Sequence, residues 1–264
     1  MEVHRPCQQP ARQWIAVKIS ATIITRNEQD NLPRALQSLA CCDEIVIVDS
    51  GSTDRTVEVA RGLGARVVER DWSGYAPQKN FAASQAEHDW ILALDADEAV
   101  SEQLQREIEQ LKQQGARDDG YAFPRLAQYR GRWIRHSGWY PDRKVRLYDR
   151  RKGRWVGDYV HESVRVEGQV GELAGDLLHY TCPTFSRHVE TVNRYTTLAA
   201  REMAAQGRGV SLPRLVAAPP WAFVRSYVLQ RGFLDGRDGF LIAAMAAFYV
   251  FAKYAKAKWP EGVS

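Results

Sequence analysis

The segment "WILALDADEAV", Trp90–Val100, contains an apolar run followed by three acidic residues within four positions. The run Trp90–Leu94 predicts a buried strand, because strands that are covered on both faces are continuously apolar. Asp95, Asp97 and Glu98 follow directly, and carboxylates crowded in this way repel one another and resist leaving water. The arrangement costs stability unless a cation or hydrogen-bond donors lie among them, so the segment is a candidate binding site.

Strand and helix patterns alternate around this segment over the first 115 residues. The predicted strands are "ISATIIT" (19–25), "EIVIVD" (44–49), "ARVVER" (65–70) and "WILALD" (90–95). Helical patterns lie at 31–40, in the stretch that ends at Gly64, at 78–89 and at 101–115. This alternation predicts an α/β fold with a mostly parallel sheet flanked by helices.

Polar residues follow three of the predicted strands at the point where each strand ends. They occupy Thr25–Glu28, Asp49–Asp54 and Asp95–Glu98. Open parallel sheets bind their ligands at the carboxyl ends of the strands. We therefore expect the three clusters to lie along one edge of the sheet and to form one site.

The second cluster belongs to the turn "VDSGSTDRT", residues 48–56. Gly51 permits a tight turn there, and Ser52 or Asp54 can cap the next helix, whose N-terminus favours anionic ligands. The stretch contains neither GxGxxG nor GxxxxGK[ST], so a dinucleotide site and a P-loop are unsupported. An ordinary strand-to-helix turn is the alternative.

The tripeptide Asp95-Ala96-Asp97 places two carboxylates one residue apart at a strand end. One carboxylate can reach Mg²⁺ or Mn²⁺ while the other meets a ribose hydroxyl or a second ligand, since Mg²⁺ commonly takes one or two protein carboxylates plus phosphate oxygens. A divalent metal is therefore the predicted cofactor. The alternative is a solvated acidic loop, against which the preceding apolar strand argues.

The formal charge of +4 conceals a strong asymmetry. Residues 125–155 carry a net charge of +9 and residues 186–258 a net charge of +7, so the rest of the chain is acidic. Basic regions attract phosphorylated substrates, nucleic acid or anionic lipid. In the first region Arg alternates with Trp and Tyr, which suits a phosphorylated glycan or single-stranded nucleic acid; a solvated loop is the alternative.

From Thr184 onward the chain has helical patterns, the later one at about 219–231. The final apolar run, Phe240–Ala252, is shorter than the about 20 residues that span a bilayer, and lysines follow it up to Lys258. This run predicts a segment that lies in the interface of an anionic membrane, with core packing as the alternative.

The cysteines and the first residues predict the compartment. Cys7, Cys41, Cys42 and Cys182 form no CxxC pair, which is typical of a reducing environment. The first 20 residues contain no apolar core long enough for a secretory signal. We therefore expect a cytoplasmic protein that is peripheral on a membrane.

The motifs "ATIITRNEQDNL", "EIVIVDSGSTDRTVEVA" and "QKNFAASQAEHDWILALDADE", in this order and spacing, resemble the nucleotide-sugar half of family 2 glycosyltransferases, which have the GT-A fold. The resemblance is strongest over Ile19–Leu111. "DRKVRLYDR", "VHESV", "DLLHYT" and the closing "RGFLDGRDGFLIAAMAAFYVFAKYAKAKW" resemble the bacterial lipopolysaccharide core heptose β-1,4-glucosyltransferases. The resemblance implies a catalytic domain at 15–183, with a nucleotide-sugar half (19–115) and an acceptor half (116–183), and a membrane-associating helical extension at 184–264.

The resemblance also implies roles for single residues. Six would surround the nucleotide-sugar: Thr25, Arg26 and Glu28 at the nucleotide, Asp49 at the uracil, Lys79 at the base or diphosphate, and Asp95 at the ribose. Asp97 would hold the metal that bridges the diphosphate, where the departing UDP gathers negative charge. His179 is either a further metal ligand or a buried structural histidine.

Family 2 enzymes invert the configuration of the sugar, so a carboxylate must take the proton of the attacking hydroxyl. The resemblance favours Glu162 in "VHES" as this base. Asp158 and Asp142 are its rivals, and the alternative for Glu162 is an exposed strand carboxylate.

The predicted function is an inverting, metal-dependent transfer of glucose from UDP-glucose onto a heptose of the lipopolysaccharide inner core, on the cytosolic face of the inner membrane. The expected partners are a UDP-sugar, a phosphorylated glycolipid acceptor and an anionic membrane surface. Nucleic acid is not expected, because a sugar-transfer site beside the basic region favours a glycan. The alternatives are another cell-envelope polysaccharide or lipid-linked acceptor on the same fold, and a non-catalytic nucleotide-sugar-binding module at the membrane.

Overall fold

The computed structural model describes residues 17–157 and 162–259, which form two compact units. The first unit contains the described residues of Met1–Asp95, Glu102–Ala122 and Val145–Leu173. The second contains Ala96–Ser101, Phe123–Lys144 and the described residues of Ala174–Ser264. The chain therefore passes between the units five times, and Asp95 and Asp97 belong to different units.

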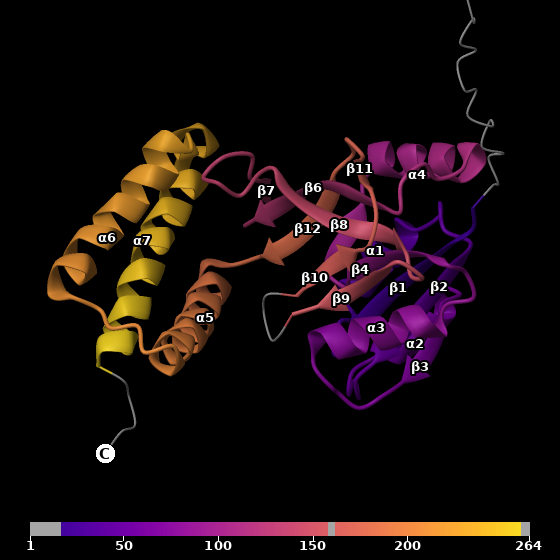
Figure 1. Cartoon of the computed structure of the whole chain (residues 1–264), viewed down its shortest axis with the longest axis horizontal. Helices are drawn as coiled ribbons and strands as arrows, with labels where there is room; N and C mark the ends of the chain where they lie inside the picture. Colours follow the sequence, from indigo (N-terminus) through magenta and orange to yellow (C-terminus); the bar gives the residue numbers. More distant parts are fainter. Residues whose placement is uncertain (1–16, 158–161, 260–264) are drawn as a thin grey trace, which may run out of the picture. The chain divides into compact units, whose positions relative to one another are not determined.

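The first unit is built on a sheet with the strand order β3-β2-β1-β4-β8-β6 (Figure 1). Its parallel strands are β1 (Ile19–Thr25), β2 (Glu44–Asp49), β3 (Arg66–Glu69) and β4 (Trp90–Asp95). Strand β8 (Asp142–Asp149) pairs antiparallel with β4, and β6 (Gly120–Tyr129) follows it in the order. The parallel strands predicted from the apolar runs are confirmed.

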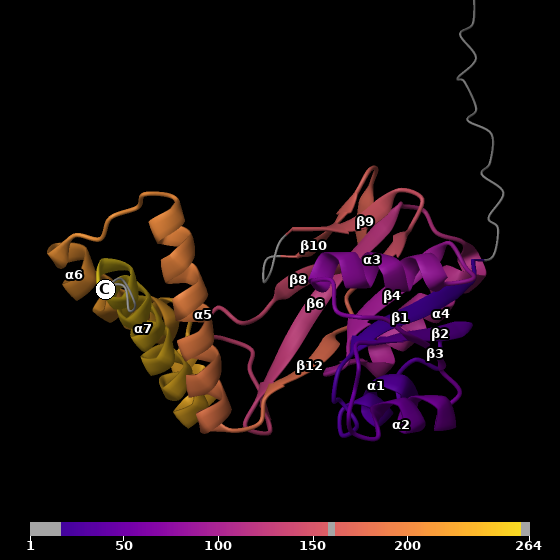
Figure 2. The same cartoon turned by 90° about the horizontal axis from the view of Figure 1, so that it is seen from below.

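Helices lie on both faces of these parallel strands. They are α1 (Leu32–Gln37), α2 (Thr56–Gly62), α3 (Tyr75–Gln85) and α4 (Glu102–Gln114). In Figure 2, α1 and α2 lie on one side of β1 and β4 and α3 lies on the other. Right-handed crossovers place them so, because the chain winds outward from β1 to β3 and then returns to β4. The winding reverses between β1 and β4, and α/β sheets bind ligands at such a reversal.

Helix α3 differs from the predicted helix at 78–89. It begins at Tyr75, after Gly74 with φ of +103°, and it ends at Gln85, because Ala86 is extended. The shift leaves the side chains of Gln78 and Lys79 in the first half of the helix, where both are buried. Lys79 is thereby held inside the unit rather than at its surface.

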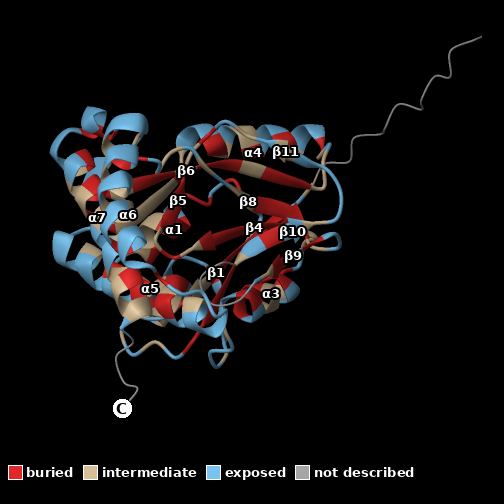
Figure 3. Cartoon of the chain, turned by 60° about the vertical axis from the view of Figure 1, so that its left-hand side comes forward, coloured by how far each residue is buried: buried red, intermediate tan, exposed pale blue. Residues whose placement is uncertain are grey.

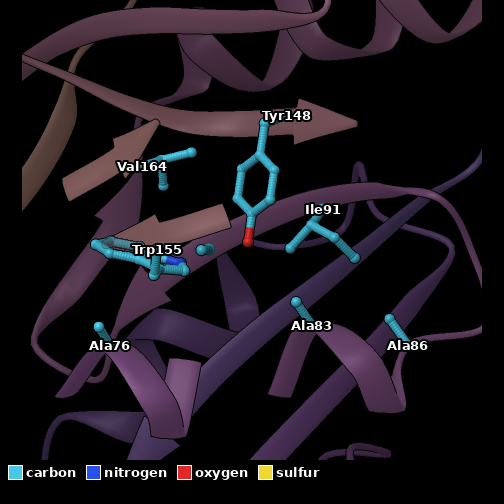
Figure 4. Close-up of a cluster of buried hydrophobic side chains, with 8 residues drawn as sticks. Ala76, Ala83, Ala86, Ile91, Tyr148, Trp155 and Val164 are labelled. Atoms are coloured by element: carbon cyan, nitrogen blue, oxygen red, sulfur yellow. The ribbon is translucent and has the colours of Figure 1, made fainter. Parts of the chain in front are cut away.

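The first unit is completed by β9 (Gly153–Val156), β10 (Ser163–Val166) and β11 (Val170–Glu172). Buried colour dominates β4 and β8 in Figure 3. In Figure 4, Tyr148 and Trp155 lie between Ile91, Val164 and the alanines of α3. Because alanine side chains are small, the aromatic rings of β8 and β9 pack directly against this helix.

The second unit combines strands with a group of helices. Strand β12 (Leu177–Cys182) pairs parallel with the later part of β6 and antiparallel with β5 (Glu98–Val100), and β7 (Arg132–Trp133) also pairs with β6. The helices are α5 (Phe185–Ala205), α6 (Leu212–Val224) and α7 (Gly236–Lys258). The predicted α/β fold with a C-terminal helical extension is confirmed, whereas the functional boundary at 183/184 stays a prediction.

Helix α6 starts earlier than the helical pattern at 219–231 predicts. Pro213 occupies the second helical position, which suits a proline because its missing N–H has no partner to lose there. Pro219 and Pro220 lie inside the helix instead of at its start. A π-helical turn (Arg225–Leu229) and a 3₁₀ turn (Gly232–Asp235) connect α6 to α7.

The apolar segment at the C-terminus is longer than its sequence pattern predicts. Residues 232–258 form a stretch of 27 residues with a mean hydropathy of 1.4 over its most apolar window, and only 22% of that window is buried. By length and composition alone this helix could cross a membrane, and the interfacial segment stays a prediction. Most of the apolar window is uncovered by protein.

Candidate active site

The loops that follow β1 and β2 are joined by hydrogen bonds. Asn27, with φ of 57°, donates its N–H to Ser52 Oγ (2.9 Å), and its Oδ1 accepts the N–H of Thr53 (2.8 Å). The N–H of Glu28 donates to Thr56 Oγ1 (2.8 Å). These bonds bring the first and second predicted polar clusters together at one edge of the sheet.

The predicted residues of the first cluster differ in accessibility. Thr25 is buried and paired with Asp49 across the sheet, Arg26 is exposed, and Glu28 is half-buried. Because the Arg26 side chain is exposed, a ligand at this edge of the sheet can reach it. The geometry places all three beside the turn after β2.

The Asp49 carboxylate organises that turn and is 2% exposed. It accepts hydrogen bonds from Thr25 Oγ1 (3.1 Å), from the N–H groups of Gly51 (3.0 Å) and Ser52 (2.8 Å), and from the Ser52 hydroxyl. Gly51 has φ of +76°, a conformation that favours glycine. The carboxylate thus uses its acceptor positions on its own turn and on Thr25 of β1, and its contact with uracil stays a prediction.

Of the two predicted helix caps, only Asp54 contacts the start of α2. Its Oδ1 accepts the N–H of Thr56 (3.0 Å). The Ser52 hydroxyl turns back to Asp49, so the prediction that Ser52 could cap this helix is wrong. Ser52 Oγ donates a hydrogen bond to the Asp49 carboxylate and accepts the N–H of Asn27, so it does not bind the first N–H groups of α2.

Asp95 lies at the end of β4 between two cations of the first unit. Lys79 Nζ is 2.7 Å from its Oδ1, and Arg146 Nη2 is 2.8 Å from its Oδ2. Both cationic side chains are 5% exposed. Burial opposes ionisation, but the charges of Arg146 and Lys79 outweigh it and hold the pKa of Asp95 well below its usual range. These cations compensate the electrostatic cost that the sequence suggests.

Glu162 joins the same cluster, with Oε1 3.3 Å from Lys79 Nζ and a side chain that is 17% exposed. The ring of Trp155 lies against both cations: Lys79 Nζ is 4.2 Å and Arg146 Cζ is 5.1 Å from its centroid. Sequence reasoning missed Arg146 and Trp155. A signal was present, because Arg146 is a charged residue inside the apolar part of "RKVRLYD".

Asp97 lies in the second unit and meets His179 there. Its Oδ2 is 3.3 Å from His179 Nε2, and its backbone oxygen accepts the N–H of Tyr180 (2.9 Å). The side chains are 33% and 16% exposed, respectively. A carboxylate oxygen beside an imidazole nitrogen is a donor set that suits Mn²⁺ and tolerates Mg²⁺.

Within residues 17–157 and 162–259, no group of three or more His, Cys, Asp or Glu side chains could hold a metal by itself. This donor count fits an ion that takes most of its ligands from a diphosphate and from water. The residues present therefore suit a metal that arrives with its nucleotide, rather than a closed protein site.

Glu98 has a structural partner in the second unit. It is fully buried, and its Oε1 is 3.5 Å from Arg125 Nη1. Arg125 Nη2 is also 2.7 Å from Oδ2 of Asp142, one of the rival bases. The other rival, Asp158, lies outside the described residues.

The comparisons with known proteins agree with this fold. The sequence profile described as glycosyl transferase family 2 matches residues 20–166. An uncharacterized glycosyltransferase of Rickettsia typhi is 34% identical over 251 residues, which cover 90% of this chain and 86% of the relative. The lipopolysaccharide core biosynthesis glycosyltransferase LpsC of Rhizobium meliloti is 34% identical over 245 residues, covering 90% and 91%.

Among solved structures, a mannosyltransferase of Pyrobaculum calidifontis in complex with GDP-Man and Mn²⁺ has a TM-score of 0.53 at 14% identity. The likeness covers 94% of this chain and 89% of that one, and it supports the GT-A fold. The family profile covers more than half of the chain, and relatives match it over nearly their whole length. The chain therefore belongs to glycosyl transferase family 2 and is a glycosyltransferase.

Proposed function

We propose that this glycosyltransferase moves glucose from UDP-glucose, with inversion, onto a heptose of the lipopolysaccharide inner core. The observation that carries the proposal is the contrast between the two aspartates of the "DAD" tripeptide. Asp95 is already neutralised by Lys79 and Arg146, whereas Asp97 faces a single imidazole. A compensated carboxylate suits a hydrogen bond to ribose, and an uncompensated one suits a metal.

In this proposal Asp97, with His179 beside it, holds a divalent metal that offsets the negative charge on the departing UDP. Thr25, Arg26 and Glu28 border the nucleotide, Asp49 and its turn receive the uracil, and Lys79 lies near the diphosphate. The buried ion pairs of Lys79 fix its ammonium group before any substrate arrives, so little reorganisation is needed on binding.

Glu162 takes the proton of the attacking heptose hydroxyl in this proposal. Its side chain is partly exposed, and its Oε1 lies 3.3 Å from Lys79 Nζ, which holds the carboxylate beside Asp95. Asp142 is the rival among the described residues, because it lines a pocket of the second unit together with His179.

The acceptor class rests on the relative that is named a lipopolysaccharide core biosynthesis glycosyltransferase. The basic segment 125–155, in which Arg alternates with Trp and Tyr, suits a phosphorylated glycolipid. Another cell-envelope polysaccharide or lipid-linked acceptor, and a non-catalytic nucleotide-sugar-binding module, are the competing functions.

A transfer assay with the purified full chain, UDP-glucose, Mn²⁺ or Mg²⁺ and a heptose-terminated core oligosaccharide tests this function. We expect glucosylated product, and we expect Asp97→Asn to lower kcat by about 10² or more, because the metal supplies several kcal/mol to the transition state. Glu109→Gln, on the exposed face of α4, is the control and should be unaffected. Product formation at the wild-type rate by Asp97→Asn would contradict the proposal that Asp97 holds the metal.

A second substitution tests the base. Glu162→Gln should bind UDP normally and lose turnover by about 10² to 10⁴, the usual contribution of a general base. A fully active variant would move the assignment to Asp142 or Asp158. UDP binding without turnover by the wild type, over a screen of UDP-sugars and acceptors, would favour the binding module.

We further propose that α6 and α7 attach the enzyme to the cytosolic face of the inner membrane, as a peripheral protein. Twelve of the 18 exposed large apolar side chains of the described chain lie between Leu212 and Trp259. They include Val216, Trp221, Leu229, Phe233, Phe240 and Phe248, and Figure 3 shows the exposed colour along both helices. A helix from the core of a soluble protein would be mostly buried, but α7 is not.

The charges around these helices favour an anionic membrane. Residues 208–258 contain eight Lys or Arg and only Asp235 and Asp238 as acids. Asp235 accepts the backbone N–H of His136 (2.9 Å), and Asp238 pairs with Arg130 (3.4 Å), so both acids have partners within the second unit. The remaining positive charge complements lipid headgroups of negative charge.

Vesicle sedimentation tests the membrane proposal. The triple variant Phe240→Ser, Phe248→Ser, Phe251→Ser should bind phosphatidylglycerol-containing vesicles at least about tenfold more weakly, because each Phe loses buried apolar area. The triple variant Leu63→Ser, Val170→Ser, Val189→Ser changes exposed apolar residues elsewhere, which are 36–42% exposed against 46–50% for the three Phe, and is the control. Equal vesicle binding by the two triple variants would refute the proposal that the exposed apolar residues of α7 attach the protein to the membrane.

A further inference from the structure

The second unit contains a pocket of about 300 Å³ whose polar lining is Arg125, Asp142, His179 and Thr181 and whose aromatic wall is Trp139. Two small residues complete it. Small-molecule sites range from about 300 to 1,000 Å³. A volume at the lower end of this range holds one sugar ring rather than a nucleotide.

The charges of the pocket are compensated by one another. The Arg125 guanidinium lies between Asp142 (2.7 Å) and Glu98 (3.5 Å), and Lys144 Nζ is 3.0 Å from the second oxygen of Asp142. A phosphate would compete with two carboxylates for this guanidinium, and Glu98 is fully buried. The pocket therefore favours a neutral ligand with several hydroxyl groups over a phosphate.

Trp139 is held in place as one wall of the pocket. Its ring packs edge-on against Tyr129, at 5.8 Å between centroids and 82° between planes, and against His188 at 6.2 Å and 75°. A fixed aromatic face contacts the C–H face of a pyranose at little cost in conformational entropy. The planar guanidinium of Arg125 and the planar carboxylate of Asp142 can each hydrogen-bond to two neighbouring hydroxyl groups of a sugar.

Two residues, Thr181 and His179, relate the pocket to the proposed chemistry. The Thr181 hydroxyl makes no hydrogen bond to another described residue, so it is available to a ligand. His179 lines the pocket and also lies 3.3 Å from Asp97, the residue proposed for the metal. The pocket is therefore next to the second aspartate of the tripeptide, within the same unit.

We infer that this pocket binds the acceptor ring that carries the attacking hydroxyl, as a neutral pyranose stacked on Trp139 and hydrogen-bonded by Thr181 and Asp142. The inference rests on the proposed function, because it needs a sugar acceptor. It adds that the phosphates of the acceptor are bound elsewhere. Arg125 positions Asp142 instead of contacting phosphate.

Steady-state kinetics of the full chain test the inference, with a heptose-terminated core oligosaccharide in its native form and after chemical dephosphorylation. Trp139→Ala should raise the acceptor KM about tenfold on both forms, the loss expected for one stacked ring. The donor KM and the hydrolysis of UDP-glucose without acceptor should stay within about twofold of the wild type. Phe185→Ala, an exposed aromatic residue of α5, is the control.

Thr181→Val keeps the shape of the side chain and removes only the hydroxyl, so it guards against misfolding of the Trp139 variant. It should raise the acceptor KM severalfold with unchanged melting temperature. An unchanged acceptor KM in both variants would overturn the inference, and so would a loss that occurs with the phosphorylated acceptor alone.

A binding measurement separates failure of this inference from failure of the proposed function. If the wild type glucosylates no heptose acceptor, the proposed function fails, and saturation-transfer NMR with methyl heptoside and methyl α-mannoside still examines the pocket. A signal in the wild type that is lost in Trp139→Ala supports the pocket as a pyranose site. The absence of any signal in the wild type overturns it.

Discussion

Strand β4 and helix α7 are both strongly apolar, but only β4 is enclosed by protein. Ile91 and Leu92 are 0% exposed, whereas Phe240 and Phe248 are 50% and 46% exposed. The strand has neighbours on both edges and side chains packed on both faces, while α7 buries only one side, through residues such as Ile242 and Ala243. An apolar run therefore identifies a surface that avoids water, and the surrounding elements decide whether protein or another medium covers it.

The largest expected effect comes from shortening an apolar side chain of β4, with the same kind of change in α7 for comparison. Leu92→Ala should destabilise the protein by about 2 to 5 kcal/mol, because it leaves a cavity in the sheet. Phe248→Ala should cost less than about 1 kcal/mol, because half of its ring already contacts solvent. Urea unfolding of the detergent-free proteins measures both. Equal losses would show that α7 is packed as tightly as β4.

The next largest effect should come from the cation that pairs with Asp95, the last residue of β4. Lys79→Met removes a cation that is 5% exposed and leaves Asp95 and Glu162 with less compensation, so we expect a loss of about 2 to 3 kcal/mol. Lys152→Met breaks an ion pair of similar length to Asp119, but Lys152 is 52% exposed, and its loss should be within about 1 kcal/mol.

The double variant Lys79→Met, Glu162→Gln sharpens the same test. It removes one of the two carboxylates that Lys79 compensates, so it should recover part of the stability lost in Lys79→Met. A double variant that is less stable than the single one would show that Glu162 has another stabilising partner. Urea unfolding at pH 7 measures all of these variants.

The smallest expected effect concerns the first residue of β1. Asp43 Oδ2 accepts the N–H of Ile19 (2.8 Å) and lies 2.9 Å from Lys112 Nζ, and Asp43→Asn should cost about 1 kcal/mol at pH 7. Burial raises the pKa of Asp43, but the Ile19 N–H and Lys112 outweigh it and lower the pKa below its usual value.

The sign of the pH dependence follows from this depressed pKa. The contribution of Asp43 is present above the pKa of the unfolded chain, about 3.9, and is lost as the pH falls through the lower pKa of the folded state. The stability difference between the wild type and Asp43→Asn should therefore be full at pH 7 and shrink below about pH 4. A difference that is constant down to pH 2 would contradict the assignment.

The sequence predicts those features that depend on neighbours along the chain. Strands β1, β2 and β4 are apolar over their whole length, so their burial is visible without knowledge of their partners. The contact of Asp97 with His179 is not predictable from local pattern, since the two are 82 positions apart; the resemblance implies only that His179 is a further metal ligand, with a structural histidine as the alternative. The contact with Arg146 that compensates Asp95 also comes from a distant strand.

The features that the sequence does not predict depend mostly on contacts between segments that are distant along the chain. Trp155 contacts Lys79 and Arg146 because three separate segments meet, and no spacing in the sequence encodes that meeting. The start of α6 was misplaced because two prolines inside a helix resemble two prolines at its beginning. The compensation of Arg125 by Glu98 and Asp142 is likewise a product of the tertiary fold.

The interleaving of the two units has a consequence for synthesis on the ribosome. The first unit includes Val145–Leu173, so Tyr148 and Trp155 enter its core only after the intervening segment Phe123–Lys144 of the second unit has been translated. Until then, Ile91 and the alanines of α3 lack their aromatic partners, and the nascent chain exposes an unpaired edge of β4. Translation pauses that occur before Tyr148 and Trp155 have left the ribosome should therefore expose the chain to chaperones and proteases.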